Sequence, residues 1–207
     1  IEGLSPSISI DQKTTSRNPR STVGTVTEIY DYLRLLYARI GRPTCPVHNI
    51  EISSHTYEEM VNKVFMYEEE SIVKVLAPIV QERKGTFEST FESLRKDGYS
   101  KVIVDGEQLD LDEEIVLEKN KKHNIMLVVD RLKLRKENRS RLYESIETAA
   151  SLSEGKLYVE VNDEQLFFSE HYCCPICGFT VSKLEPSLFS FNSPLGACPT
   201  CKGLGSI

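Results

Sequence analysis

Three pairs of potential metal ligands stand out in this chain. Two residues separate the members of each pair, which are Cys45 with His48, Cys174 with Cys177, and Cys198 with Cys201. This spacing lets one tight turn direct two side chains toward one ion, and thiolate and imidazole groups are the ligands of structural zinc sites. No carboxylate adjoins the ligands in sequence, so the pattern predicts a structural Zn²⁺ and not a catalytic one.

The three pairs can be grouped in two ways, because a structural zinc takes four ligands. In one grouping the second and third pairs form a four-cysteine site and the first pair is idle. In the other, the first and second pairs share one ion, and the third pair is half of a site completed by residues outside this chain. We prefer the second grouping, because its zinc would join the two ends of the segment 56–170 that lies between the pairs. Cys173 and the histidines His55, His123 and His171 are interpreted as ordinary side chains.

The segment 56–170 has the patterns of an α+β domain, a sheet with helices. We expect helices that begin at Thr56, near Phe87, and at Asn138 or Ser140, and strands at 72–80, 102–104, 115–117, 125–129, 157–161 and 166–168. The dipeptides Asp105-Gly106 and Asn162-Asp163 predict hairpin turns.

The flanking segments differ from this domain. A helix is expected from Thr25, capped together with Glu28, to Ile40, and Gly41 ends it. After residue 170 the chain is rich in cysteine, proline and glycine and has little periodicity, which is typical of a segment that relies on a metal for order. The predicted architecture is therefore an inserted sheet-plus-helices domain on a zinc-stabilised, partly irregular base.

The net charge of −6 conceals an uneven distribution. Residues 56–170 carry 25 acidic and 17 basic side chains, whereas the rest of the chain carries 6 acidic and 8 basic ones. Because a nucleic-acid surface needs local positive charge, the acidic segment favours a protein partner, and the flanks are compatible with DNA.

One basic row interrupts the acidic segment. Leu132 and Leu134 alternate with Arg131, Lys133 and Arg135. Successive side chains of a strand point to opposite faces, so the cations face outward if the leucines enter the core. Lys101, at the start of a strand, can also face outward.

The class of protein is further limited by what the sequence lacks. It has no apolar run of about 18 residues and no signal peptide, and its cysteines suggest metal binding more than disulfides. We therefore expect a cytoplasmic protein with no membrane contact. Its first and last residues suggest a piece of a longer chain.

Two blocks resemble the UvrA family of DNA-repair ATPases. The first is residues 1–34, which begin Ile-Glu-Gly-Leu-Ser-Pro, and it resembles part of the first ATP-binding half. The second comprises Cys174-Pro-Ile-Cys-Gly and the stretch 188–205, which resemble the zinc module of the family. The segment 56–170 lies where the family carries its UvrB-binding insertion. The resemblance implies that residues 1–44 belong to the first ATP-binding domain, that 45–55 and 171–207 are zinc-binding segments, and that 56–170 is a UvrB-binding domain.

The resemblance also implies a function. Members of this family are ABC-type ATPases that dimerise, scan DNA for damage and load UvrB in nucleotide excision repair. Gln12 matches the glutamine that senses Mg²⁺ and the γ-phosphate of ATP. Lys101 and Arg131 would be the anchors for UvrB, and Lys133 and Arg135 would lie in the same row.

The chain departs from the family pattern in three ways. It has no G-x-x-x-x-G-K-[ST] phosphate loop, no evident Walker B carboxylate and no ABC signature stretch. We therefore expect no enzyme activity from this segment, with ATP and Mg²⁺ bound only by the full-length protein. The alternative reading is a stand-alone zinc-ribbon nucleic-acid-binding protein, which would need basic and aromatic residues clustered at the cysteine pairs.

Overall fold

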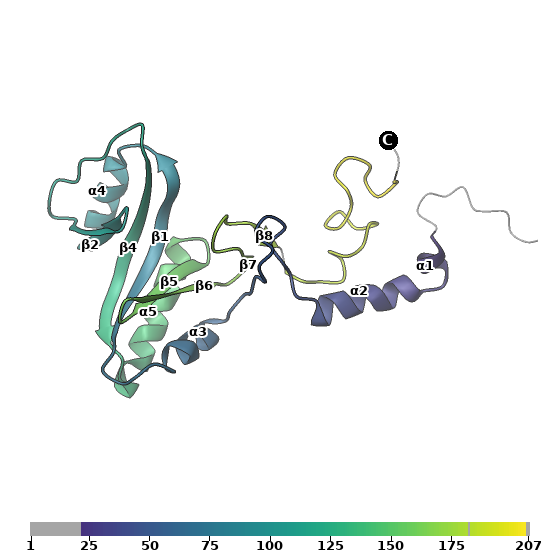
Figure 1. Ribbon diagram of the computed structural model, residues 1–207, viewed down its shortest axis with the longest axis horizontal. Helices are drawn as coiled ribbons and strands as arrows, with labels where there is room; N and C mark the ends of the chain where they lie inside the picture. Colours follow the sequence, from purple (N-terminus) through teal and green to yellow (C-terminus); the bar gives the residue numbers. More distant parts are fainter. Residues whose placement is uncertain (1–21, 182, 206–207) are drawn as a thin grey trace, which may run out of the picture. The chain divides into compact units, whose positions relative to one another are not determined.

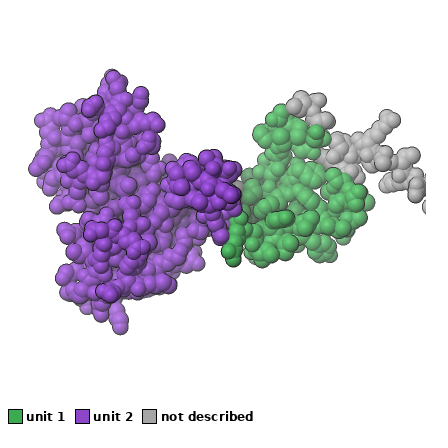
Figure 2. Space-filling model, in the orientation of Figure 1, with its two compact units in different colours: residues 1–42, 184–207 green, residues 43–183 purple. Residues whose placement is uncertain are grey.

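The computed structural model describes residues 22–181 and 183–205. The chain divides into two compact units, Pro43–Lys183 and the combination of Ile1–Arg42 with Leu184–Ile207 (Figure 2). Gln12 lies outside the described residues. Within these ranges, no helix has the length and apolar character needed to cross a membrane.

A six-stranded antiparallel sheet forms the centre of the larger unit (Figure 1). Its strand order is β3-β2-β4-β1-β5-β6. The strands are β1 (Ile72–Lys84), β2 (Lys101–Val104), β3 (Glu107–Asp110), β4 (Lys122–Lys133), β5 (Lys156–Val161) and β6 (Glu164–Ser169). Together with the helices, this sheet confirms the mixed α+β class.

Three helices share one apolar core with the sheet. They are α3 (Tyr57–Val64), α4 (Glu88–Lys96) and α5 (Arg139–Leu152), and the short 3₁₀ helix η1 (Lys136–Asn138) leads into α5. The predicted capping box begins α3, because Thr56 Oγ1 accepts from the amide of Glu59, and Glu59 Oε2 accepts from the amide of Thr56 at 2.8 Å. Both predicted hairpin turns are present, between β2 and β3 and between β5 and β6.

The strand predicted at 115–117 is wrong. This segment is a loop in which Ile115 is buried and Val116 is 81% exposed. The two neighbours of β4 in the sheet are β1 and β2, so no place beside it remains for another strand. The guanidinium of Arg95 holds the preceding loop instead, by donating to the carbonyl oxygens of Leu111 and Glu113.

The helix predicted from Thr25 is divided in two. The capping box joins Thr22 to Thr25, and it begins the short α1 (Val23–Val26). Glu28 has a φ of 62° and precedes α2 (Ile29–Ile40). The predicted pairing of Thr25 with Glu28 is therefore wrong, because Glu28 is a left-handed residue between two helices and not the third residue of one.

A buried histidine ties the start of β4 to its surroundings. His123 is 2% exposed, its Nδ1 lies 2.8 Å from Asp105 Oδ2, and its Nε2 lies 3.0 Å from the carbonyl oxygen of Glu118. Because both partners are acceptor oxygens, the protonated imidazole can donate to both of them. The Asp105 carboxylate first, and the Glu118 carbonyl second, raise the pKa of His123.

We expect the larger unit to lose stability as the pH rises above neutrality. A histidine whose folded-state pKa is raised contributes stability that is fully present below its unfolded pKa of about 6.5 and is lost as the pH rises through the folded value. Urea denaturation at about pH 6 and about pH 9 measures the loss. The variant His123→Gln should flatten the dependence, whereas His171→Gln, at an exposed position, should retain it. Equal slopes in both variants would contradict this assignment.

Candidate functional site

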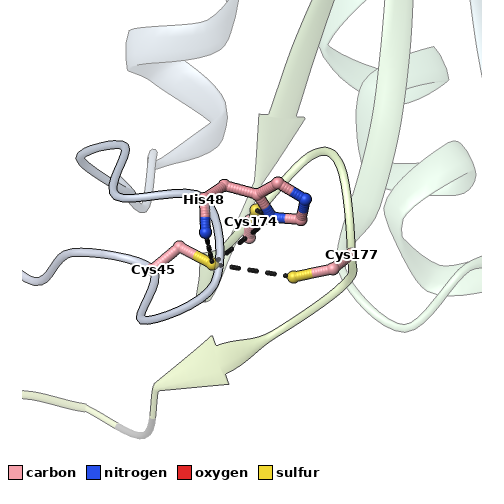
Figure 3. A group of neighbouring side chains, drawn as sticks. All are labelled: Cys45, His48, Cys174 and Cys177. Carbon is pink, nitrogen blue, oxygen red and sulfur yellow. Dashed lines mark hydrogen bonds between the residues drawn. The ribbon is translucent and has the colours of Figure 1, made fainter.

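Four of the predicted ligands converge within the larger unit. Potential ligand atoms of Cys45, His48, Cys174 and Cys177 all lie within 4.8 Å of one another (Figure 3). Cys45 Sγ lies 3.6 Å from His48 Nδ1 and 3.6 Å from Cys177 Sγ, and Cys174 Sγ lies 3.6 Å from His48 Nδ1. The structure therefore brings together the first and second pairs, which is the grouping preferred from the sequence.

The three distances of 3.6 Å suit one tetrahedral ion. Metal–sulfur bonds of about 2.3 Å and metal–nitrogen bonds of about 2.0 Å place the ligand atoms of a tetrahedron roughly 3.5–3.8 Å apart. The group could hold a metal ion, and its soft sulfur and imidazole donors are those of zinc.

The first and second pairs lie in the same kind of turn. The amide of the residue four positions after the first cysteine donates to that cysteine's carbonyl oxygen, from Asn49 to Cys45 and from Gly178 to Cys174. Asn49 and Gly178 both have positive φ, at 54° and 71°. Asparagine and glycine adopt this conformation more readily than other residues, which explains their presence at the end of each turn.

The two turns are attached to different short elements. The first lies between Thr44 and Glu51, which form an isolated antiparallel bridge. The second joins β7 (Tyr172–Cys173) to β8 (Thr180–Val181), which pair as a two-stranded sheet. Cys45, Ile52 and Cys174 are buried together in a small apolar cluster separate from the core of the larger sheet.

Hydrogen bonds favour the thiolate form of Cys45. Burial would raise its pKa, but the backbone amides of His48 and Val47 outweigh burial and lower the pKa to about 6. At Cys177 the Phe179 amide lowers the pKa, yet burial and the neighbouring thiols Cys45 and Cys174 raise it overall. One thiolate is therefore favoured within the cluster, and ionising further thiols beside it calls for a cation.

The third pair lies in the smaller unit. Cys198 and Cys201 occupy a turn like the other two, because the amide of Lys202 donates to the carbonyl oxygen of Cys198 and Lys202 has a φ of 51°. The amides of Cys201 and Thr200 lower the pKa of Cys198 to about 7. Among the residues that the structure describes, this pair belongs to no group of three or more potential ligands.

The predicted basic row lies on the sheet as expected. Leu132 and Leu134 are 6% and 2% exposed, whereas Arg131, Lys133 and Arg135 are exposed. Across β4, β1 and β5, Arg131 is in register with Lys74, and Lys74 is in register with Glu160. We call the face that carries these polar residues, together with Lys101 of β2, the charged face.

Acidic residues within the chain neutralise part of the charged face. Glu70 accepts from Arg135 Nε at 2.5 Å and from Lys133 Nζ at 3.2 Å, and these hydrogen bonds lower its pKa to about 2. Lys74 Nζ lies 2.5 Å from Glu160 Oε1. Within the described part of the chain, Lys101 and Arg131 have no ion-pair partner. The sequence did not indicate that Glu70 and Glu160 matter here, because no local pattern pairs them with residues 63 and 86 positions away.

Comparison with known proteins gives one family. The family model described as "UvrA interaction domain" matches residues 55–163. The chain is 59% identical over 207 residues to UvrABC system protein A of Listeria innocua, 60% identical over 206 residues to that of Bacillus subtilis, and 58% identical over 206 residues to that of Staphylococcus epidermidis. These matches cover 99–100% of this chain but 22% of each relative's length.

Proposed function

Because this chain belongs to the UvrA family of DNA-repair proteins, as the match to its interaction domain shows, we propose that it carries the zinc-anchored UvrB-binding region of that family. In this proposal residues 56–170 bind UvrB and recruit it to damaged DNA during nucleotide excision repair. The full-length protein is cytoplasmic in this proposal, and it forms the dimer and contacts DNA. It also contains the ATP site, to which Gln12 would contribute.

The main support for UvrB binding is the charged face. The face lies on a domain that is acidic overall, yet Lys101 and Arg131 are cationic groups that the chain itself does not neutralise within its described residues. Arg131 is next to Lys74, whose ammonium is already bound to Glu160. An unpaired guanidinium can bind a carboxylate of a partner through two parallel hydrogen bonds. Lys133 and Arg135, which Glu70 holds, would contribute at the rim of the interface.

Zinc has a structural role in this proposal. Cys45, His48, Cys174 and Cys177 would complete a closed tetrahedral site, with His48 ligating through Nδ1, and such sites leave no open position for a substrate. The ion would join the segments that enter and leave residues 56–170. Cys198 and Cys201 would be half of a second site, completed outside this chain, because their turn repeats the geometry of the other two.

Acetylation of lysines, mapped by mass spectrometry with and without UvrB, tests the location of the interface. We expect UvrB to protect Lys101 several-fold, because acetic anhydride reacts with exposed free amines and an interface excludes it. Lys119 and Lys121, which are exposed elsewhere on the domain, should react equally in both samples. Protection of the latter pair with Lys101 unchanged would assign UvrB to another surface.

We also expect no binding of ATP by this chain. The backbone amides of a phosphate loop supply most of the grip on a nucleotide, and the sequence contains no such motif. Isothermal calorimetry with ATP and Mg²⁺ should give no heat of binding. Micromolar affinity would contradict the assignment of the ATP site to the remainder of the full-length protein.

A further inference from the structure

Strands β1 and β4 continue together beyond their neighbours in the sheet. The pairing of β5 with β1 covers Val73–Leu76, and that of β2 with β4 covers residues 125–127. The pairing of β1 with β4 continues to Arg83 opposite His123 and to Lys84 opposite Lys122. The upper end of the sheet in Figure 1 is thus a two-stranded ribbon. We call residues 82–84 and 118–123 the basic ribbon.

The basic ribbon reverses the charge of its domain. Its five exposed lysine and arginine residues are Arg83, Lys84, Lys119, Lys121 and Lys122. Its acidic residues are Glu82 and Glu118, and His123 is buried beside Asp105. The domain-wide excess of acidic residues, which disfavours DNA, therefore does not describe this part of the surface.

Two carboxylates at the basic ribbon, those of Glu82 and Asp105, are bound within the fold. Glu82 accepts from Asn124 Nδ2 at 3.0 Å and from Lys122 Nζ at 3.3 Å. Asp105 accepts from His123 and, at 2.8 Å, from the amide of Asn124. These hydrogen bonds lower the pKa of both carboxyl groups.

The other four cations of the ribbon are available to a ligand. Within the described residues, Arg83, Lys84, Lys119 and Lys121 have no ion-pair partner.

Hydrogen bonds also fix the backbone segments that carry these cations. Asn124 Oδ1 accepts from the amide of Glu82 at 2.9 Å, which joins β1 to β4 beyond the sheet. His123 Nε2 holds the carbonyl oxygen of Glu118, and the amide of Lys121 donates to that same oxygen in a turn. Cations presented on an ordered backbone lose less conformational entropy on binding than cations on a disordered one.

We propose that the basic ribbon binds the phosphodiester backbone of DNA. Each phosphate that a lysine or arginine neutralises releases condensed counterions, which supplies affinity without sequence preference. A two-stranded ribbon is narrow enough to approach a groove of the duplex. The proposal goes beyond UvrB binding, because it gives this domain its own DNA contact at a site separate from the charged face.

An acidic protein is the less suitable ligand. Protein interfaces place apolar or aromatic side chains beside their charged anchors, as Ile103 lies two residues from Lys101 on the charged face. The basic ribbon has no large apolar side chain of its own, since its residues are Glu-Arg-Lys and Glu-Lys-Asn-Lys-Lys-His. The chemistry of the ribbon matches a repeated, regularly spaced anion.

The test uses the whole 207-residue chain and a fluorescein-labelled duplex of random sequence, with anisotropy measured over a series of salt concentrations. With about four phosphate contacts, the slope of log affinity against log salt should be about −3 to −4. In Lys84→Glu/Lys121→Glu the affinity at low salt should fall at least about tenfold and the slope should approach half the wild-type value. The control Lys96→Glu/Lys136→Glu makes the same change of charge at exposed positions outside the ribbon and should bind within about twofold of wild type.

UvrB affinity is measured on the same variants, so that the two proposals fail separately. Lys84→Glu/Lys121→Glu should keep its UvrB affinity while losing DNA. The inference is overturned if the wild-type chain does not bind DNA at low salt, or if ribbon and control variants lose DNA equally. It is also overturned if the ribbon variant loses UvrB and keeps DNA, which would make an acidic protein the ligand.

Discussion

Replacing Cys45 with serine should release the metal from this protein. Wild type should contain one tightly held zinc per chain, because Cys45, His48, Cys174 and Cys177 would provide the four ligands of a closed structural site. Binding free energies of about 10–16 kcal/mol are typical of structural zinc in peptides at neutral pH, so removing one thiolate has a large effect. Zinc measured by mass spectrometry after dialysis should fall close to zero in Cys45→Ser.

The matched control is the third pair. Cys198→Ser makes the same substitution in the same kind of turn, and it should retain the zinc of wild type. Loss of zinc from Cys198→Ser with full occupancy in Cys45→Ser would instead support the four-cysteine grouping. Unfolding should also differ, because loss of the ion exposes the small cluster around Ile52, whereas the core of the larger sheet is separate.

Reversing the charge of Arg131 should weaken UvrB binding by more than tenfold. Arg131→Ala removes a guanidinium that no carboxylate within the described chain holds, and we expect a loss of at least about tenfold, or about 1.4 kcal/mol. Arg131→Glu adds repulsion of the partner's carboxylates and should cost more. The dissociation constant, measured by biolayer interferometry, reports both.

Two comparisons separate the role of Arg131 from a general effect of charge. Lys119→Glu introduces the same sign of charge in the basic ribbon and should leave UvrB affinity within about twofold of wild type. Lys133→Glu should have a smaller effect than Arg131→Glu, since Glu70 already binds this ammonium. An Arg131→Glu/Lys101→Glu variant with wild-type affinity would place the interface elsewhere.

Local patterns predicted much of this fold. The reciprocal bonds of Thr56 and Glu59, the turn at Asp105-Gly106 and the burial of Leu132 each depend on residues a few positions apart. The strand order depends on distant segments, because β1 lies between β4 and β5, and no periodicity identifies such neighbours. The segment 115–117 illustrates this limit, because its apolar residues suggested a strand beside β4, where β1 and β2 occupy both sides.

The candidate site was predictable to a similar degree. Cysteine spacing indicated the candidate ligands, and the placement of the pairs around 56–170 indicated which two pairs converge. The sequence could not show which cations lack an ion-pair partner, because Glu70 binds Lys133 and Arg135 from a different part of the chain. The basic ribbon was missed for the same reason: its two halves are about 40 residues apart, and β-pairing brings them together.

The central claim is that residues 56–170 bind UvrB largely through charge, and a titration of UvrB into the 207-residue chain without ATP or DNA tests it most directly. At about 50 mM salt we expect saturable binding of one UvrB per chain, and at about 500 mM salt a much weaker affinity, mainly through slower association. No binding at low salt, or an affinity that salt leaves unchanged, would contradict the claim.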